Sequence, residues 1–241
     1  MTESTQGAAP AELSHWKSRL DLAATVLIVL TCLLVSWKIW ATGLVPPPSR
    51  AAAASVPAEP ISVAGAPSKG RREAPVVIVL FSEFQCPYCG QFSRETLPLL
   101  ITDYIDTGRA SLVFKHLPIP SHRDARGAAV AAACADSQGQ FWPLHDAFFA
   151  NPGSLDSAAI AQQAESVGLD RNAFSRCTTT DSAQAVRVVD ANIREAAQLK
   201  VTGTPTFFFG HWQADGTVKA VQRMSGAQPY VRFKEILDGL K

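Results

Sequence analysis

The chain has 241 residues, 47% of them apolar, so it can bury the core of one ordinary domain and still carry additional segments. Its 22 basic and 21 acidic residues nearly cancel, which leaves no basic excess for nucleic acid and no charged run that would hold the chain open. We therefore expect a folded domain that does not bind nucleic acid.

An apolar segment near the N terminus predicts a membrane anchor. Residues 22–37 contain no charged side chain, and the apolar character resumes after Lys38 to reach the length of about 20 residues that spans a bilayer. Lys17 and Arg19 precede this segment, which favours a cytoplasmic N terminus and a main domain outside the cytoplasm. We predict a cytoplasmic tail at 1–19 and a single-pass cell-membrane anchor at 20–45.

Two other interpretations of this segment are open. It could be a signal peptide, because the small residues at 51–55 could be cleaved, and the domain would then be secreted. It could also be a buried helix of a soluble protein, although no polar face interrupts it. The following residues, 46–73, are rich in Pro, Ala and Ser without apolar periodicity, which predicts a flexible linker.

A folded domain is expected over 74–241. The β-branched run at 74–81 is typical of a buried central strand, and a helix should follow from Pro87, with a kink at Pro98. Residues 111–119 predict a second strand.

Helical patterns then continue through an insertion at about 122–200, in which Asp156 should cap a helix. Two further strands are expected at 204–209 and 218–224, and a closing helix should begin at Pro229. The order β-α-β, helical block, β-β-α indicates an α/β fold with a helical insertion.

The stretch FSEFQCPYCG, residues 81–90, carries the main chemical signal. Cys86 follows the first strand, and Pro87 fits the first turn of the next helix, so Cys86 should lie where free N–H groups and the helix dipole stabilise a thiolate. Cys89 lies on the same face of the helix, within reach of Cys86. Cys86 is therefore placed to attack or leave a disulfide, and Cys89 to resolve the mixed disulfide.

A zinc site and an inert structural disulfide explain this motif less well. Zinc requires two more ligands, yet the other cysteines of the domain, Cys134 and Cys177, are isolated, and the histidines show no paired spacing. A structural Cys86–Cys89 bridge would restrain a single helical turn. We predict a redox couple and no metal at this motif.

Three further residues of the domain could have a role, one beside the couple and two in a structural disulfide or a second redox couple. Glu83, three positions before Cys86, could accept a proton from Cys89 if it is buried; otherwise it is an exposed acid at the end of a strand. Cys134 and Cys177 could form a second disulfide in an exported domain, or remain two buried thiols.

Four motifs together give the chain a family resemblance. FSEFQCPYCG, CADSQGQFWPLHDAFF, GLDRNAFSRC and VTGTPTFFF resemble the DsbA-like thioredoxin-fold oxidoreductases over essentially all of 74–241. The resemblance implies that Pro205 is cis and packs against the CxxC motif, and that Thr204 offers backbone groups to an extended substrate. It also supports pairing of Cys134 with Cys177. The strongest oxidants of this family have histidine where this chain has Tyr88, so its redox potential is an open question.

These features predict a membrane-anchored, extracytoplasmic thiol–disulfide oxidoreductase that acts on unfolded or partly folded exported proteins. The exchange needs no non-protein cofactor, and the resemblance implies reoxidation by a quinone-linked membrane partner of the DsbB-like or VKOR-like type. Two alternatives remain: a reductase or isomerase using the same couple, and a copper- or redox-responsive thioredoxin-like binding protein, since copper(I) favours thiolates.

Overall fold

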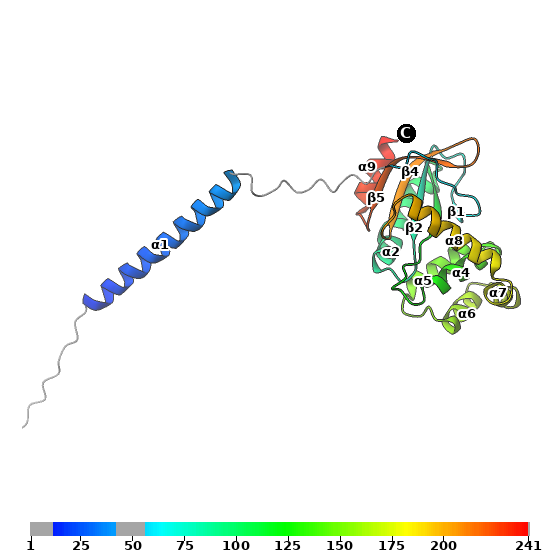
Figure 1. Cartoon of the computed structure of the whole chain (residues 1–241), viewed down its shortest axis with the longest axis horizontal. Helices are drawn as coiled ribbons and strands as arrows, with labels where there is room; N and C mark the ends of the chain where they lie inside the picture. Colours follow the sequence, from blue (N-terminus) through cyan, green and yellow to red (C-terminus); the bar gives the residue numbers. More distant parts are fainter. Residues whose placement is uncertain (1–11, 42–55, 241) are drawn as a thin grey trace, which may run out of the picture. The chain divides into compact units, whose positions relative to one another are not determined.

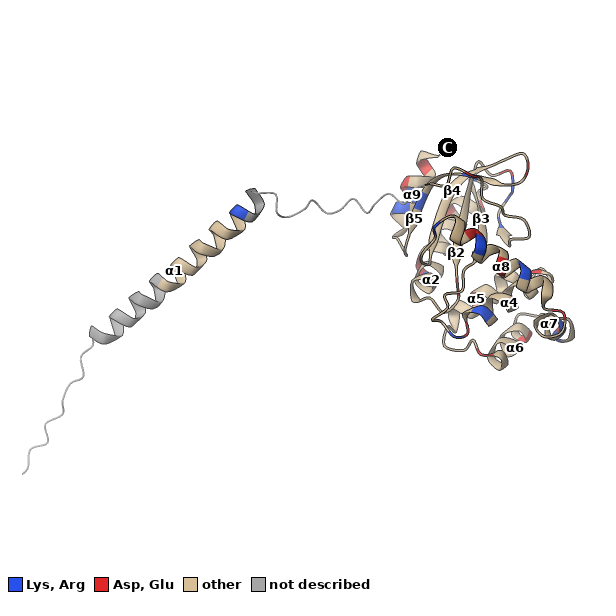
Figure 2. Cartoon of the chain, viewed as in Figure 1, with Lys and Arg blue, Asp and Glu red and all other residues tan. Residues whose placement is uncertain are grey.

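The computed structural model describes residues 12–41 and 56–240, and the chain divides into two units, Met1–Ala53 and Ala54–Lys241 (Figure 1). The first unit contains helix α1 (Glu12–Ala41). Its described side chains, at 24–38, are exposed and mostly apolar, and Lys38 is the charged residue among them (Figure 2). Within the described parts of the chain, no helix meets the length and hydropathy expected of a membrane span.

A five-stranded sheet forms the centre of the second unit, in the order β1-β3-β2-β4-β5. Strands β2 and β3 are parallel, and the remaining neighbours are antiparallel. The strands are β1 (Ser68–Lys69), β2 (Val76–Ser82), β3 (Ala110–His116), β4 (Thr206–Trp212) and β5 (Val218–Ser225). The last four lie where the sequence predicts strands, with ends shifted by a few residues.

Strand β2 is buried on both faces, as its continuous apolar run predicts. Val76, Ile78 and Leu80 face one hydrophobic cluster, which also includes Phe207 of β4 and Phe233 of helix α9 (Tyr230–Gly239). The alternate residues of β2 face the other cluster, together with Ala196 of helix α8 (Ala183–Gln198). Because successive side chains of a strand point to opposite faces, one short run supplies both cores.

The helix after β2 is interrupted by wider turns. It comprises α2 (Pro87–Gln91), η1 (Phe92–Thr96), α3 (Leu97–Leu100) and η2 (Ile101–Ile105), of which η1 and η2 are π-helical. Pro98 lies in the middle, where it lacks an N–H and its ring opposes a regular α-helical turn. Wider turns are a known way to absorb such a defect.

Helices α4 to α8 form the predicted insertion between β3 and β4, and they gather at one end of the unit (Figure 1). The Asp156 carboxylate accepts hydrogen bonds from Ala158 and Ala159 N–H at the start of α6, as predicted. The insertion helices are α4 (Ala125–Asp136), α5 (Phe141–Ala150), α6 (Ser157–Ser166), α7 (Arg171–Thr178) and α8 (Ala183–Gln198).

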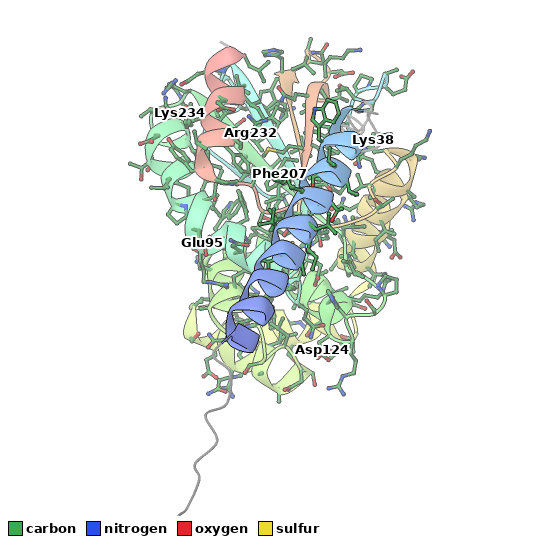
Figure 3. The ribbon with its side chains drawn as sticks, turned by 90° about the vertical axis from the view of Figure 1, so that its left-hand side faces the viewer. Lys38, Glu95, Asp124, Phe207, Arg232 and Lys234 are labelled. Atoms are coloured by element: carbon green, nitrogen blue, oxygen red, sulfur yellow. A yellow bond between two sulfur atoms is a disulfide. The ribbon has the colours of Figure 1, made fainter. Side chains whose placement is uncertain are left out.

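Pro229 caps the closing helix α9 (Tyr230–Gly239), which also agrees with the sequence. Its buried face contributes Phe233, Ile236 and Leu237 to the core. Arg232 and Lys234 lie on its exposed face (Figure 3), where each pairs with an acidic residue of the same helix.

The predicted linker at 46–73 requires correction in its described second half. Ile61 is fully buried and forms a bridge with Val218 of β5, and Ser68–Lys69 forms β1 on β3. We call residues 56–69 the strap. A one-residue bridge and a two-residue strand are too short to produce an apolar periodicity in the sequence. The sequence therefore does not show that the strap pairs with the two edges of the sheet.

Candidate redox site

Cys86 lies where the turn after β2 enters a helix. It is the N-cap of α2, with φ −72° and ψ 119°, and Pro87 follows at the start of the helix. The backbone N–H groups of Tyr88 and Cys89 are close enough to stabilise negative charge on the Cys86 sulfur. The structure thus places Cys86 where the sequence predicts a stabilised thiolate.

The segment before β4 covers Cys86 from the other side. The Cys86 thiol donates to the Thr204 carbonyl oxygen at an Sγ–O distance of 3.4 Å, and the Thr204–Pro205 peptide bond is cis. Cys86 is 5% exposed, whereas the neighbouring Tyr88 is 62% exposed. The Cys86 sulfur is thus mostly covered, and the exposed Tyr88 ring lies two positions after it in the chain.

The two cysteines have opposite acidities. The pKa of Cys86 falls to about 5, chiefly because the Cys89 thiol donates to its sulfur, and the Thr204 side chain and two backbone N–H groups act in the same direction against burial. The pKa of Cys89 lies well above its ordinary value, because Cys89 is fully buried and faces the Cys86 charge. At neutral pH the reduced pair therefore holds a thiolate at Cys86 and a thiol at Cys89.

Glu83 lies inside the protein, below the same turn. Its side chain is fully buried, and its carboxylate accepts from the Gln85 backbone N–H at 2.7 Å and contacts His122 Nδ1 at 2.5 Å. Burial raises the pKa of Glu83, the two hydrogen bonds oppose this effect, and the Cys86 charge adds to it. Glu83 thus has the buried environment that the sequence interpretation requires.

Sequence reasoning did not assign His122, Gln85 or Asp124 to the site. The Gln85 side chain accepts from the Asp124 backbone N–H at 2.7 Å and donates to the Asp124 carboxylate at 3.3 Å, which ties the loop before α4 to the turn before Cys86. Figure 3 shows Asp124 beside the insertion helices. The topology could have indicated these residues. Because β2 and β3 are parallel, the loop after β3 lies at the same edge of the sheet as the turn after β2 that carries Cys86.

Cys134 and Cys177 form a disulfide, with their Cα atoms 5.8 Å apart. The bond joins α4 to α7 and closes a sequence separation of 43 residues inside the insertion. His116 and His145 are buried packing residues, and burial lowers the pKa of His116 to about 3, so its ring is neutral. Within the described residues, His, Cys, Asp and Glu form no cluster of three that could hold a metal ion.

A family model described as Thioredoxin matches residues 63–225. The chain belongs to the thioredoxin family. The match begins within the strap and ends in β5, so it includes the cysteine pair, the insertion and the Thr204–Pro205 segment.

Comparison with individual proteins places this thioredoxin-family chain among DsbA-like folds. The crystal structure of Wolbachia pipientis alpha-DsbA1 superposes with a TM-score of 0.66 at 22% identity, covering 75% of this chain and 92% of that chain. A probable disulfide bond formation protein D of Bacillus cereus is 35% identical over 85 residues, which are 35% of this chain and 39% of that protein. The predicted DsbA-like thioredoxin fold is confirmed.

A third similar protein is named as an ion antiporter. Na(+)/H(+) antiporter NhaA 1 of Salinispora arenicola is 34% identical over 200 residues, which are 78% of this chain and 30% of the antiporter. The chain thus spans less than a third of the length of this antiporter.

Proposed function

We propose that the protein is an extracytoplasmic thiol–disulfide oxidoreductase that forms disulfides in exported proteins through the Cys86–Cys89 couple. The observation that carries the proposal is the asymmetry of the pair: a Cys86 sulfur with a pKa of about 5 beside a buried Cys89 thiol. This is the arrangement that a thiol–disulfide exchange centre needs, since one sulfur must leave readily and the other must stay protonated until required.

The exchange proceeds in two steps. A substrate thiolate attacks Cys86 Sγ of the oxidised protein, the Cys86–Cys89 bond breaks, and Cys89 leaves as a thiolate that takes up a proton. A second substrate thiolate then attacks the substrate sulfur of the mixed disulfide, and Cys86 leaves as the stabilised thiolate. The substrate loses two electrons to form its disulfide, and the protein ends with a Cys86 thiolate and a Cys89 thiol.

The acidity of Cys86 favours the oxidising direction over reduction or isomerisation. A more stable thiolate stabilises the reduced protein and raises its reduction potential. The pKa of about 5 lies between the values of about 7 for thioredoxin and about 3.5 for DsbA. With Tyr88 between the two cysteines, the Cys86 thiol is thus more acidic than that of thioredoxin and less acidic than that of DsbA. Reoxidation would fall to a quinone-linked membrane partner of the DsbB-like or VKOR-like type.

Substrate contacts are assigned to the groups around Cys86. Tyr88 offers an exposed aromatic ring, Pro87 begins the helix after Cys86, and the Thr204 carbonyl oxygen lies against the Cys86 sulfur, with the cis Pro205 following it. An extended substrate chain beside Thr204 would bring its cysteine within reach of Cys86. These contacts are mostly backbone and apolar, which suits unfolded substrates of varied sequence.

We further propose that α1 anchors the domain in the cell membrane. Large apolar side chains of α1 are exposed over residues 26–37, and leaving them in water is unfavourable. The apolar stretch and the basic residues before it support a single pass with the domain outside the cytoplasm. Extraction of cell membranes with alkaline carbonate tests this: an anchored chain stays in the pellet, and release into the supernatant contradicts the anchor.

The activity is tested with the full chain in detergent, by oxidative refolding of a reduced protein substrate and by reduction of insulin. We expect Cys86→Ser to lose at least about 100-fold in refolding rate, whereas Cys32→Ser in α1 retains the wild-type rate. Oxidation that proceeds equally well with Cys86→Ser would overturn the proposal. Insulin reduction without oxidative refolding would instead assign the reductase or isomerase direction.

A further inference from the structure

The buried position of Cys89 creates a need for a proton carrier. Cys89 is fully buried, so the thiolate released when a substrate attacks Cys86 has no direct contact with solvent. Leaving a charge in such an environment is costly, and rapid protonation makes the forward step favourable. The need follows from the proposed exchange reaction, on which this inference rests.

Glu83 is the buried acidic residue whose backbone contacts Cys89. The Glu83 backbone N–H and the Ser82 side chain both interact with the Cys89 sulfur. The Glu83 carboxyl group is itself fully buried, and burial raises its pKa, so it can hold a proton inside the protein. A proton delivered from Glu83 must be replaced from outside, and a buried carboxyl group cannot obtain it from water directly.

His122 connects Glu83 with solvent. Its Nδ1 lies 2.5 Å from Glu83 Oε1, and its side chain is 30% exposed. The imidazole can receive a proton at one ring nitrogen and pass one on at the other. The loop that carries His122 is fixed by the pair of Gln85–Asp124 hydrogen bonds, so this contact is held by two segments of the fold.

Other titratable and charged groups lie around this pair. On the α2 side, the Cys86 charge acts on the Glu83 carboxyl group and the Cys89 sulfur contacts the Glu83 backbone N–H, and these two sulfur atoms are the reacting groups themselves. From the α4 side, the Asp124 carboxylate contacts the Gln85 amide and the exposed Arg123.

We propose that His122 supplies protons to Cys89 through Glu83 and is therefore a positioning residue for thiol–disulfide exchange. When the Cys86–Cys89 bond breaks, the Cys89 thiolate takes the Glu83 proton, Glu83 takes a proton from the His122 imidazolium, and His122 is reprotonated by water. The electrons remain with the sulfur atoms, and one proton enters from solvent for each mixed disulfide formed. In the reverse direction the same groups carry the Cys89 proton outward.

The test measures mixed-disulfide formation by the oxidised full chain in one turnover, with a cysteine-containing peptide and acid quenching. His122→Gln keeps a hydrogen-bonding side chain and removes the proton carrier, and His122→Ala removes both. We expect a rate about tenfold lower in each, less than the roughly 100-fold of a directly acting acid or base. His211→Gln is the matched control, since His211 also contacts an oxygen, that of Pro75, and lies at the opposite end of β2.

Two readouts separate proton transfer from a structural role. Free imidazole in the buffer should restore the His122→Ala rate in proportion to its concentration, and the pH dependence of the rate should change in both His122 variants. Wild-type rates and pH profiles in these variants would overturn the inference, as would a slow His122→Ala that imidazole does not restore. If the wild-type chain itself fails to react with the peptide, the proposed function has failed instead.

Discussion

Cys86 and Cys89 are chemically identical side chains that the fold places in opposite environments. Cys86 receives hydrogen bonds from a thiol and from backbone N–H groups at a helix start, whereas Cys89 is fully buried and faces the Cys86 charge. The difference in pKa therefore comes from a few contacts around two sulfur atoms. The difference can be measured directly because a thiolate absorbs ultraviolet light more strongly than a thiol.

The reduced protein should gain stability as pH rises from 5 to 9. The pKa of Cys86 in the folded protein is about 5, against an ordinary value of 9.0, so ionisation of Cys86 favours the folded state. This stabilisation is complete above pH 9 and is lost as pH falls through about 5. Thermal unfolding of the reduced and oxidised forms over this range measures it. A difference between the two forms that does not vary with pH contradicts the assigned acidity.

Glu83→Gln should make Cys86 more acidic. The charge on Cys86 raises the pKa of Glu83, and by reciprocity an ionised Glu83 raises the pKa of Cys86. Removing the carboxylate removes this repulsion, so the thiolate titration should shift below the wild-type midpoint of about 5 and the reduction potential should rise. Equilibration with glutathione buffers measures the potential. A lower potential in Glu83→Gln would contradict this electrostatic coupling.

At the scale of elements, the Cys134–Cys177 disulfide ties α7 to α4. Helix α7 is short, and Phe174 is its one buried residue, so its packing alone holds it weakly. Its position also depends on the Asp170 carboxylate, which accepts from Ala173 N–H at the helix start. The covalent bond thus fixes an element that contributes little core of its own.

Removing this bond should lower stability without abolishing exchange. We expect Cys134→Ala with Cys177→Ala to lower the free energy of unfolding by about 2–4 kcal/mol, the typical contribution of a disulfide. Urea unfolding of this double variant, in a Cys86→Ser/Cys89→Ser background, isolates the effect from the redox couple. Unchanged unfolding would show that α7 is held by packing alone, and loss of peptide exchange in the double variant alone would point to a second redox couple.

At the scale of the whole molecule, the strap joins the two edges of the sheet. Two hydrogen bonds of Ser62 hold the strap in place. The Ser62 N–H donates to Glu195 of α8, and the Ser62 carbonyl oxygen accepts from the Lys115 ammonium, each at 2.7 Å. Lys115 also pairs with Glu195 at 2.7 Å, and the Lys115 side chain is 3% exposed. The strap therefore completes the surroundings of a buried charge.

A fragment that begins at residue 74 should be less stable than one that begins at residue 56. The shorter fragment lacks the fully buried Ile61 side chain, and it deprives the buried Lys115 ammonium of the Ser62 carbonyl oxygen. Burial of one such aliphatic side chain alone contributes about 1.5–3 kcal/mol. Thermal unfolding of both fragments measures the difference. Equal midpoints would show that the strap rests on the sheet without stabilising it.

The sequence by itself determined the features that depend on neighbouring residues. The apolar run of β2, Pro87 after Cys86, Asp156 before α6 and Pro229 before α9 each act on adjacent backbone, so local pattern was sufficient to predict them. The four family motifs extended this to the DsbA-like fold.

The tertiary structure decided which distant residues meet. The contact of His122 with Glu83 spans 39 positions, that of Thr204 with Cys86 spans 118, and Ile61 pairs with Val218 across the sheet edge. The sequence around His122 or Ile61 does not indicate which residue each one contacts. Those contacts depend on where the strands end and on the order of the strands in the sheet. The contribution of the Thr204 side chain to the acidity of Cys86 and the burial of Glu83 follow from the same three-dimensional arrangement, so only the folded chain could establish them.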